Sequence, residues 1–205
     1  MKDSKKPLNF IIIGPPASGK GTQAKLLLKK IKTLHYVYPG EIFRTLFKAN
    51  TDAGERIKKI SESGGLQPEE LATTLWMHEI SFNVKKGQGF LLDGSPRKTG
   101  EAKSLYGFLK FLNMVKTTIL FLINISEKES YKRLTERVDA VTGKKIKRAE
   151  DDPKKVKLRW NLYRKETLPA INYMKRKGCR FVKINGEQPI EKVFKDILKA
   201  IHPVK

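Results

Sequence analysis

The sequence predicts an α/β protein whose P-loop parallel sheet of about five strands carries helices on both faces. Short apolar runs rich in β-branched residues alternate with longer segments that have helical periodicity. A helical crossover between successive strands makes those strands parallel. The 205 residues suit one well-buried domain with a small insertion, and they contain no internal repeat or low-complexity segment.

The strands are predicted from apolar runs that end at turn residues. These runs cover residues 9–13, 35–38, 89–93, 117–125 and 180–184. The third and fourth runs are apolar almost throughout, which is typical of interior strands that are buried on both faces. The sheet therefore has its most apolar strands at its centre.

The helices are predicted from apolar residues at helical spacing. They cover residues 20–32, 41–49, 53–63, 68–86, 99–112, 127–137, 152–177 and 189–201. Pro68 suits the first turn of its helix, whereas Pro169 should kink or divide the long helix that contains it. The three helices between 41 and 86 form a small helical insertion. Residues 138–150 lack periodicity and are the candidate for a lid loop.

A glycine-rich loop follows the first strand and opens the first helix. Its sequence from Gly14 to Lys20 has the G-x-x-x-x-G-K spacing that cradles phosphates. Gly14 and Gly19 allow backbone amides to turn toward an anion, the helix N-terminus adds partial positive charge, and Lys20 reaches the outer phosphates. The loop predicts a nucleoside triphosphate site. Gly21 stands where a hydroxyl usually follows the lysine, and Thr22 comes one place later.

Three sequence signals should meet at one edge of the sheet. The glycine-rich loop follows the first strand, Gly40-Glu41 follows the second, and Asp93 ends the third. Ligands of open parallel sheets bind at the carboxyl ends of the strands. We therefore expect these groups to form a single site.

The chain is strongly basic. It has 43 Lys and Arg residues against 21 Asp and Glu, a net charge of +22. Such a charge attracts polyanions, but the lysines are spread over the predicted helices, which favours at most weak, non-specific binding to nucleic acid.

Cysteine content and hydropathy indicate in which compartment we expect the protein and whether it spans a membrane. Cys179 is the single cysteine, so no intramolecular disulfide and no four-cysteine zinc site is possible, and a reducing cytoplasm fits. No apolar run approaches the ~20 residues of a membrane span. We expect a soluble, cytoplasmic monomer.

Two motifs together resemble the adenylate kinase family, within the nucleoside monophosphate kinases, over almost the whole chain. Residues 14–22, Gly-Pro-Pro-Ala-Ser-Gly-Lys-Gly-Thr, are similar to that family's P-loop, including the shifted threonine. Residues 89–97, Gly-Phe-Leu-Leu-Asp-Gly-Ser-Pro-Arg, are similar to its second signature. Six arginines also have counterparts in the family: Arg44, Arg97, Arg133, Arg137, Arg148 and Arg159. Arginine at these positions indicates planar, bidentate contacts with phosphate.

The resemblance implies reversible, Mg²⁺-dependent transfer of the γ-phosphoryl group from ATP to AMP, which gives two ADP. The ATP-binding residues that it implies are Gly14, Pro15, Ala17, Ser18, Gly19, Lys20, Gly21, Thr22 and Arg133. The implied AMP-binding residues are Pro39, Gly40, Arg44, Gln67, Gly94, Arg97 and Glu101. The implied catalytic residues are Lys20, Arg97, Arg137, Arg148 and Arg159. Thr22 and Asp93 would lie near Mg²⁺, the aspartate through water.

The family pattern also divides the arginines by role. Arg133 would stack on the donor adenine, and Arg44 and Arg97 would clamp the acceptor phosphate. The other three would converge on the phosphoryl group in transfer, whose charge is spread over its oxygens. A monophosphate acceptor is already ionised at neutral pH, so no general base is needed. His35, His78 and His202 are therefore expected to have no catalytic role.

Two segments are expected to close over the site and exclude water. The resemblance places the acceptor-binding insertion at 38–67 and the lid at 138–147 of a single kinase domain. Ten residues separate Arg137 from Arg148, too few for the zinc-ribbon lid of some members. The lid is therefore expected to work without zinc.

The acceptor pocket departs from the family pattern at two positions. Pro39 stands where adenylate-specific members usually have threonine, and Glu101 stands where they usually have glutamine. A glutamine both donates to and accepts from an adenine edge, whereas an ionised carboxylate only accepts. Glu101 thus predicts broader or shifted acceptor choice, or it is a solvated residue at a helix start. Glu150 also replaces one of the two aspartates that usually follow Arg148, with the charge kept.

Two alternatives to an ATP:AMP phosphotransferase remain at this stage. One is a kinase of another monophosphate, GMP, CMP, UMP or a deoxynucleotide. The other is a nucleic-acid-associated P-loop nucleotide-binding protein that binds nucleic acid through its net charge of +22. Retention of all six arginines argues against the second, because a binding module has no use for cations aimed at a transition state.

Overall fold

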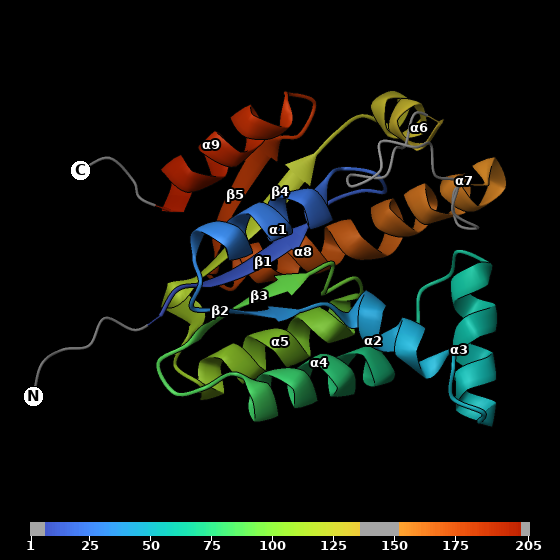
Figure 1. Cartoon of the computed structure of the whole chain (residues 1–205), viewed down its shortest axis with the longest axis horizontal. Coiled ribbons are helices and arrows are strands. Elements are labelled where there is room, and N and C mark those ends of the chain that lie inside the picture. The colour runs from blue at the N-terminus through green and yellow to red at the C-terminus, as the bar shows by residue number, and fades with distance from the viewer. Residues whose placement is uncertain (1–6, 136–151, 202–205) are drawn as a thin grey trace, which may run out of the picture.

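The computed structural model describes residues 7–135 and 152–201, and its centre is a five-stranded parallel sheet (Figure 1). The strands run in the order β2-β3-β1-β4-β5. Their bounds are β1 Asn9–Ile13, β2 Leu34–Val37, β3 Gly89–Asp93, β4 Thr118–Asn124 and β5 Arg180–Asn185. The predicted strands are confirmed to within two residues at each end. The predicted interior position of the third and fourth runs is confirmed, because β3 and β4 each have a strand on either side.

Side chains of the central strand alternate between two hydrophobic layers. Ile11 and Ile13 of β1 pack on one face, and Phe10 and Ile12 pack on the other. All five residues of β1 and all five of β3 are buried. Burial on both faces explains why these strands are largely apolar, without the alternation of a half-exposed strand.

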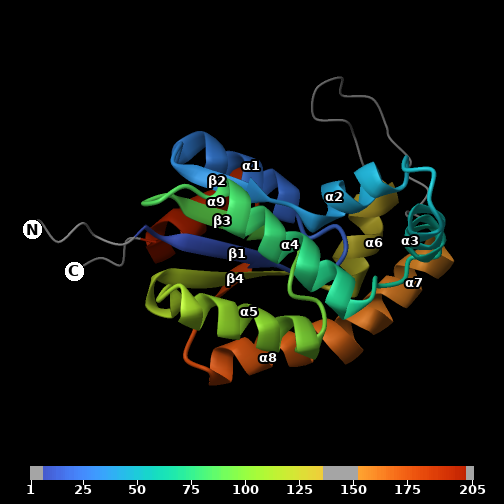
Figure 2. The same cartoon turned by 90° about the horizontal axis from the view of Figure 1, so that it is seen from below.

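Helices cover both faces of the sheet, as predicted (Figures 1 and 2). One layer consists of α1 Lys20–Lys30 and α9 Ile190–Ile201, which pack over β1 and β4. The opposite layer consists of α4 Glu69–Asn83, α5 Thr99–Phe111 and α8 Leu168–Arg176. Figure 2 shows α5 and α8 side by side below the sheet.

The remaining helices lie around the carboxyl edge of the sheet. They are α2 Pro39–Leu46, α3 Asp52–Glu62, α6 Glu127–Thr135 and α7 Pro153–Leu162. A short 3₁₀ turn at Val115–Thr117 lies at the opposite edge, where it leads into β4. The prediction that the three helices between 41 and 86 form one insertion is wrong for the third, because α4 packs in the core layer against the sheet. Helix α3 stands away from the sheet in Figure 1. Thr51 begins α3 by accepting a hydrogen bond from the amide of Gly54.

The long helical stretch near the C-terminus is divided, as its proline predicted. A π-helical segment, Tyr163–Thr167, separates α7 from α8, and Pro169 lies in the first turn of α8. A wider turn at this point accommodates a residue that lacks an amide hydrogen. The predicted lid at 138–147 lies outside the described residues. None of the described helices is long and apolar enough to cross a membrane.

Candidate active site

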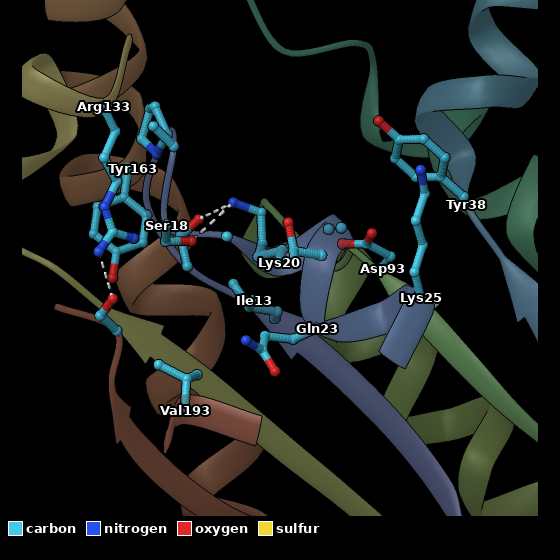
Figure 3. Close-up of a pocket in the computed structure, with 18 of the residues that line it drawn as sticks. Ile13, Ser18, Lys20, Gln23, Lys25, Tyr38, Asp93, Arg133, Tyr163 and Val193 are labelled. Atoms are coloured by element: carbon cyan, nitrogen blue, oxygen red, sulfur yellow. Dashed lines mark hydrogen bonds between the residues drawn. The ribbon is translucent and has the colours of Figure 1, made fainter. Parts of the chain in front are cut away.

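A cavity of about 1400 Å³ opens at the carboxyl edge of the sheet (Figure 3). The glycine-rich loop and α1 form its floor, and the ends of β2 and β3 form one wall. Residues of α6, α7 and the π-helical segment contribute the opposite wall. The expectation that three signals meet here is confirmed, because Lys20, Glu41 and Asp93 all line this cavity.

The backbone of the glycine-rich loop is held in a conformation that few residues adopt. Ala17 and Gly19 have positive φ angles of 57° and 89°. A Cβ atom at Gly14 would lie 2.3 Å from the carbonyl oxygen of Ile123 and 2.6 Å from Ser18 Oγ. Only glycine fits at position 14, so the loop is shaped by its backbone before any ligand arrives.

Lys20 lies folded over this loop. Its Nζ donates hydrogen bonds to the carbonyl oxygens of Gly14 at 2.9 Å and Pro15 at 2.8 Å, and to Ser18 Oγ at 3.3 Å (Figure 3). Helix α1 starts at this residue without a side-chain cap and without an acidic residue in its first turn. Its uncapped amides therefore give the floor of the cavity positive potential, which suits a phosphate.

Asp93 is the buried acid of the cavity, with 4% of its surface exposed. Tyr36 donates its phenol hydrogen to Asp93 Oδ2 at 2.9 Å. Burial raises the pKa of this carboxyl group, and the charges of Lys20 and Arg97 and the tyrosine hydrogen bond oppose that rise. Burial and the nearby carboxylate also raise the pKa of Tyr36, so the phenol stays protonated and acts as the donor.

Arg97 and Arg44 line the cavity near the ends of β3 and β2. Arg97 Nε donates to the carbonyl oxygen of Gly94 at 2.7 Å, and Thr167 Oγ1 donates to the carbonyl oxygen of Arg97 at 3.1 Å. The guanidinium carbon of Arg44 lies 5.0 Å from the centre of the Tyr38 ring. Both arginines are thus tethered on one side while they line the cavity.

Arg133 and Arg159 line the cavity from α6 and α7. Arg133 Nε donates to Glu129 Oε1 at 2.7 Å and its Nη2 donates to the carbonyl oxygen of Gly186 at 2.8 Å. Figure 3 shows Arg133 beside the glycine-rich loop. The charged residues that line the cavity are Lys20, Lys25, Lys29, Arg44, Arg97, Arg133 and Arg159, against Glu41 and Asp93. Such a balance concentrates anions in the cavity.

Five predicted site residues do not line this cavity: Pro15, Pro39, Gly40, Gln67 and Glu101. Pro39 begins α2, where it occupies the first turn, and Gly40 lies against the Tyr38 ring. Gln67 is buried, and its amide nitrogen donates to the carbonyl oxygen of Ile57 and to Ser61 Oγ. Arg137 and Arg148 lie outside the described residues.

Glu101 is buried, with 3% of its surface exposed, so its interpretation as a solvated residue at a helix start is wrong. Ser95 Oγ donates to Glu101 Oε2 at 3.1 Å. The pKa of this carboxyl group is raised by burial, while the backbone amide of Arg97, the charge of Arg97 and Ser95 lower it. The carboxylate is therefore enclosed beside the turn that carries Arg97.

Sequence reasoning missed three tyrosines that line the cavity: Tyr36, Tyr38 and, from the C-terminal half of the chain, Tyr163. Tyr36 and Tyr38 stand at and just beyond the end of β2, on the wall opposite Arg133. Their position at a strand's carboxyl end was a usable signal. Tyr163, which lines the cavity from the π-helical segment, gave none, because it is spaced like a core residue. Burial raises the pKa of Tyr163 to about 12.

Comparisons with known proteins agree with this geometry. A sequence model of the family described as adenylate kinase matches residues 12–179. An adenylate kinase from Parabacteroides distasonis is 34% identical over 200 residues, covering 97% of this chain and 100% of the relative. An adenylate kinase from Desulforamulus reducens is 32% identical over 216 residues, covering 95% and 100%. One from Ureaplasma parvum is 33% identical over 213 residues, covering 93% and 96%.

Proposed function

The chain belongs to the adenylate kinase family, and from that premise we propose that it transfers the γ-phosphoryl group of ATP reversibly to AMP, giving two ADP. The observation that carries the proposal is the cavity itself. One continuous space is lined by Lys20 and the glycine-rich loop on its floor and by Arg44, Arg97, Arg133 and Arg159 on its walls. It offers phosphate contacts for a donor and an acceptor at the same time.

The donor side is assigned to the glycine-rich loop. The amides of the loop and of the first turn of α1 bind the β- and γ-phosphates, since they are uncapped and line the cavity. Lys20 exchanges its bonds to the carbonyl oxygens of Gly14 and Pro15 for phosphate oxygens. Arg133 stacks on the adenine of the donor, where its hydrogen bonds to Glu129 and Gly186 fix the guanidinium plane.

The acceptor side is assigned to the ends of β2 and β3. Arg44 and Arg97 clamp the phosphate of AMP, and Gly94 supports Arg97 through its carbonyl oxygen. We also assign Pro39, Gly40, Gln67 and Glu101 to the acceptor pocket, on the family resemblance alone, since none of the four lines the cavity. For Glu101 to reach the base, its carboxylate must exchange the hydrogen bond from Ser95 for one to the nucleotide.

Catalysis rests on positioned cations. Arg159, together with Arg137 and Arg148 from outside the described residues, neutralises charge on the transferred phosphoryl group. The acceptor phosphate is already ionised, so no side chain has to remove a proton from it. His35 pairs with Glu79 and His78 stacks on Phe82, and neither lines the cavity, which supports the expectation that these two histidines have no catalytic role. His202 lies outside the described residues.

Mg²⁺ fits the residues at the donor phosphates. Within the described residues no group of three or more His, Cys, Asp and Glu side chains could hold a metal by itself. Mg²⁺ keeps most of its waters and binds mainly to nucleotide phosphates with one or two carboxylates, so a lone acid is sufficient. Asp93, through water, and Thr22 would hold the ion, which would neutralise charge on the donor phosphates. We assign no zinc to this protein.

Two moving parts and the solution state complete the proposal. The insertion at 38–67 closes over AMP and the lid at 138–147 closes over ATP, so that water is excluded from the phosphoryl group. We propose a cytoplasmic monomer, in agreement with the buried free thiol of Cys179. The dispersed lysines bind nucleic acid weakly and without sequence preference.

The activity is tested by initial rates with Mg-ATP and a panel of monophosphates. AMP should give the highest kcat/KM, ahead of GMP, CMP, UMP and the deoxynucleotides. A higher value for any other monophosphate would reassign the acceptor. Filter binding of RNA at physiological salt tests the basic surface, and tight, sequence-selective retention would contradict the proposal.

A further inference from the structure

Two tyrosines and an arginine form a stack along the acceptor wall of the cavity. The rings of Tyr36 and Tyr38 have centres 5.8 Å apart and planes inclined by 26°. The guanidinium carbon of Arg44 lies 5.0 Å from the centre of the Tyr38 ring, and Arg44 Nη1 donates to the Tyr38 hydroxyl at 3.4 Å. All three residues line the cavity. Tyr38 therefore stands between the half-buried ring of Tyr36 and a cavity-lining cation.

The stack is anchored at its inner end. Tyr36 belongs to β2, pairs in register with Leu91 of β3, and donates its phenol hydrogen to buried Asp93 at 2.9 Å. Tyr38, two residues later, falls on the same side of the chain. A ring fixed by the sheet and by a buried carboxylate thus supports the ring that carries Arg44.

The Tyr38 ring is open to a second cavity on one side, so its stacking on Tyr36 contributes to its support. A second cavity of about 210 Å³ lies beside the two rings and is lined also by Glu41, Ile42 and Thr45. The ring is therefore not enclosed by core side chains on all sides. A Cβ atom at Gly40 would lie 2.8 Å from the Tyr38 ring, so glycine at position 40 leaves the room that the ring needs.

We propose that Tyr38 is a positioning residue for the acceptor phosphate, acting by holding the Arg44 guanidinium over its ring. The inference rests on the proposed function, in which Arg44 binds that phosphate. Arginine on a solvated helix has many rotamers, and ordering it on binding costs entropy. A guanidinium already placed on an aromatic face has less freedom to lose, and its charge remains available to the phosphate.

The test is steady-state kinetics of Tyr38→Leu and Tyr38→Phe in the full-length enzyme. Loss of the ring in Tyr38→Leu should raise the KM for AMP about tenfold, with the KM for ATP and the kcat at saturating AMP within about threefold. Tyr38→Phe keeps the ring and should stay within about threefold for all three constants. AMP binding measured by calorimetry should weaken in parallel with the KM.

A second ring-removing variant separates positioning from helix stability. Tyr38 is the N-cap of α2 but makes no side-chain cap hydrogen bond. Tyr38→Ser removes the ring and supplies a preferred N-cap, so α2 should not be weakened. The serine variant should therefore show the same rise in the KM for AMP as the leucine variant. A KM that returns to the parent value would overturn the inference in favour of a role in helix stability.

Tyr106→Leu is the matched control. The Tyr106 ring meets the Tyr173 ring at 6.4 Å and lies 5.8 Å from Lys177 Nζ, so it belongs to another cluster of two tyrosines and a cation. It lines neither of the two cavities. This variant should leave both KM values unchanged within about twofold, since no cavity-lining cation depends on its ring.

Arg44→Ala separates failure of the inference from failure of the proposed function. If Arg44→Ala leaves the KM for AMP unchanged, the assignment of Arg44 to the acceptor phosphate is wrong. If Arg44→Ala raises it but Tyr38→Leu does not, only the role of Tyr38 is wrong. In the double variant, Tyr38→Leu should add less than about twofold to the effect of Arg44→Ala, because its target is gone. Full additivity would contradict a role through Arg44.

Discussion

The phosphate-binding side of the cavity and the pocket proposed for the acceptor base are built in different ways. On the phosphate side, positions are set by the backbone: Gly14 admits no Cβ atom, Gly19 has a positive φ, and α1 begins at Lys20 without a side-chain cap. On the base side, Gln67 and Glu101 are buried side chains engaged with their own neighbours. Backbone geometry is ready before ligand binds, whereas side chains must exchange partners. Phosphate recognition should therefore be robust, and base choice adjustable.

The largest effect expected on the phosphate side follows from removing the divalent ion. Chelation of Mg²⁺ should abolish phosphoryl transfer, because the donor phosphates need a hard divalent cation to neutralise their charge. Activity should return on addition of Mg²⁺ and should be unaffected by a zinc-selective chelator. Specific recovery by zinc would show that the metal assignment is wrong. The measurement is the initial rate after dialysis against each chelator.

Lys20→Ala and Arg97→Ala should each lower kcat at least about 100-fold, since both cations meet charge that develops on phosphate oxygens. Neither change should alter the melting temperature much, because both side chains lie at the cavity. Lys30→Ala and Arg176→Ala are matched controls on exposed last turns of α1 and α8. Near-parent turnover in either cavity variant would remove that residue from the site.

The difference between the backbone-built phosphate site and the side-chain-built base pocket also explains which parts of the site could be predicted from the sequence. The glycine-rich loop and Asp93 could be predicted because each motif is short, contiguous in sequence and located at the end of a strand. Predicting the strands therefore also predicted where the phosphate site would lie. A solvated position was one of the two alternatives for Glu101, because an acid in the first turn of a helix is usually exposed. Its burial depends on Ser95 and on the turn that carries Arg97, contacts that no periodicity records. Tyr38 was missed because its partner Arg44 is six residues away, beyond one helical turn.

The variant Glu101→Gln tests whether Glu101 determines which acceptor base is preferred. Glutamine can donate to and accept from an adenine edge, whereas a carboxylate suits the paired donors of guanine. If Glu101 reaches the base, the ratio of kcat/KM for AMP to that for GMP should rise about tenfold in the variant. Glu70→Gln, an exposed change on α4, should leave the ratio unchanged. An unchanged ratio in Glu101→Gln would show that Glu101 does not contact the acceptor base and that its role is limited to its contacts with Ser95 and Arg97.

The smallest expected effect is the pH dependence of stability in the same variant. The folded pKa of Glu101 is raised above its ordinary value, so the folded state binds this proton more tightly than the unfolded chain does. The resulting stabilisation is complete below the ordinary pKa of glutamate and is lost as the pH rises through the folded pKa. Above its folded pKa the parent carries a buried, ionised carboxylate, whereas glutamine remains neutral at every pH.

The melting temperature of Glu101→Gln relative to the parent should therefore increase as the pH rises from the ordinary pKa of glutamate, about 4, through the raised folded pKa, because the parent loses the contribution of the protonated acid. A change of roughly 2–4 °C corresponds to about 1 kcal/mol in a chain of this size. Comparing variant and parent at each pH cancels the titration of groups that both share. Glu70→Gln should give a flat difference, because that carboxylate is exposed. A flat difference for Glu101→Gln as well would mean that Ser95, Arg97 and Lys98 compensate fully for its burial.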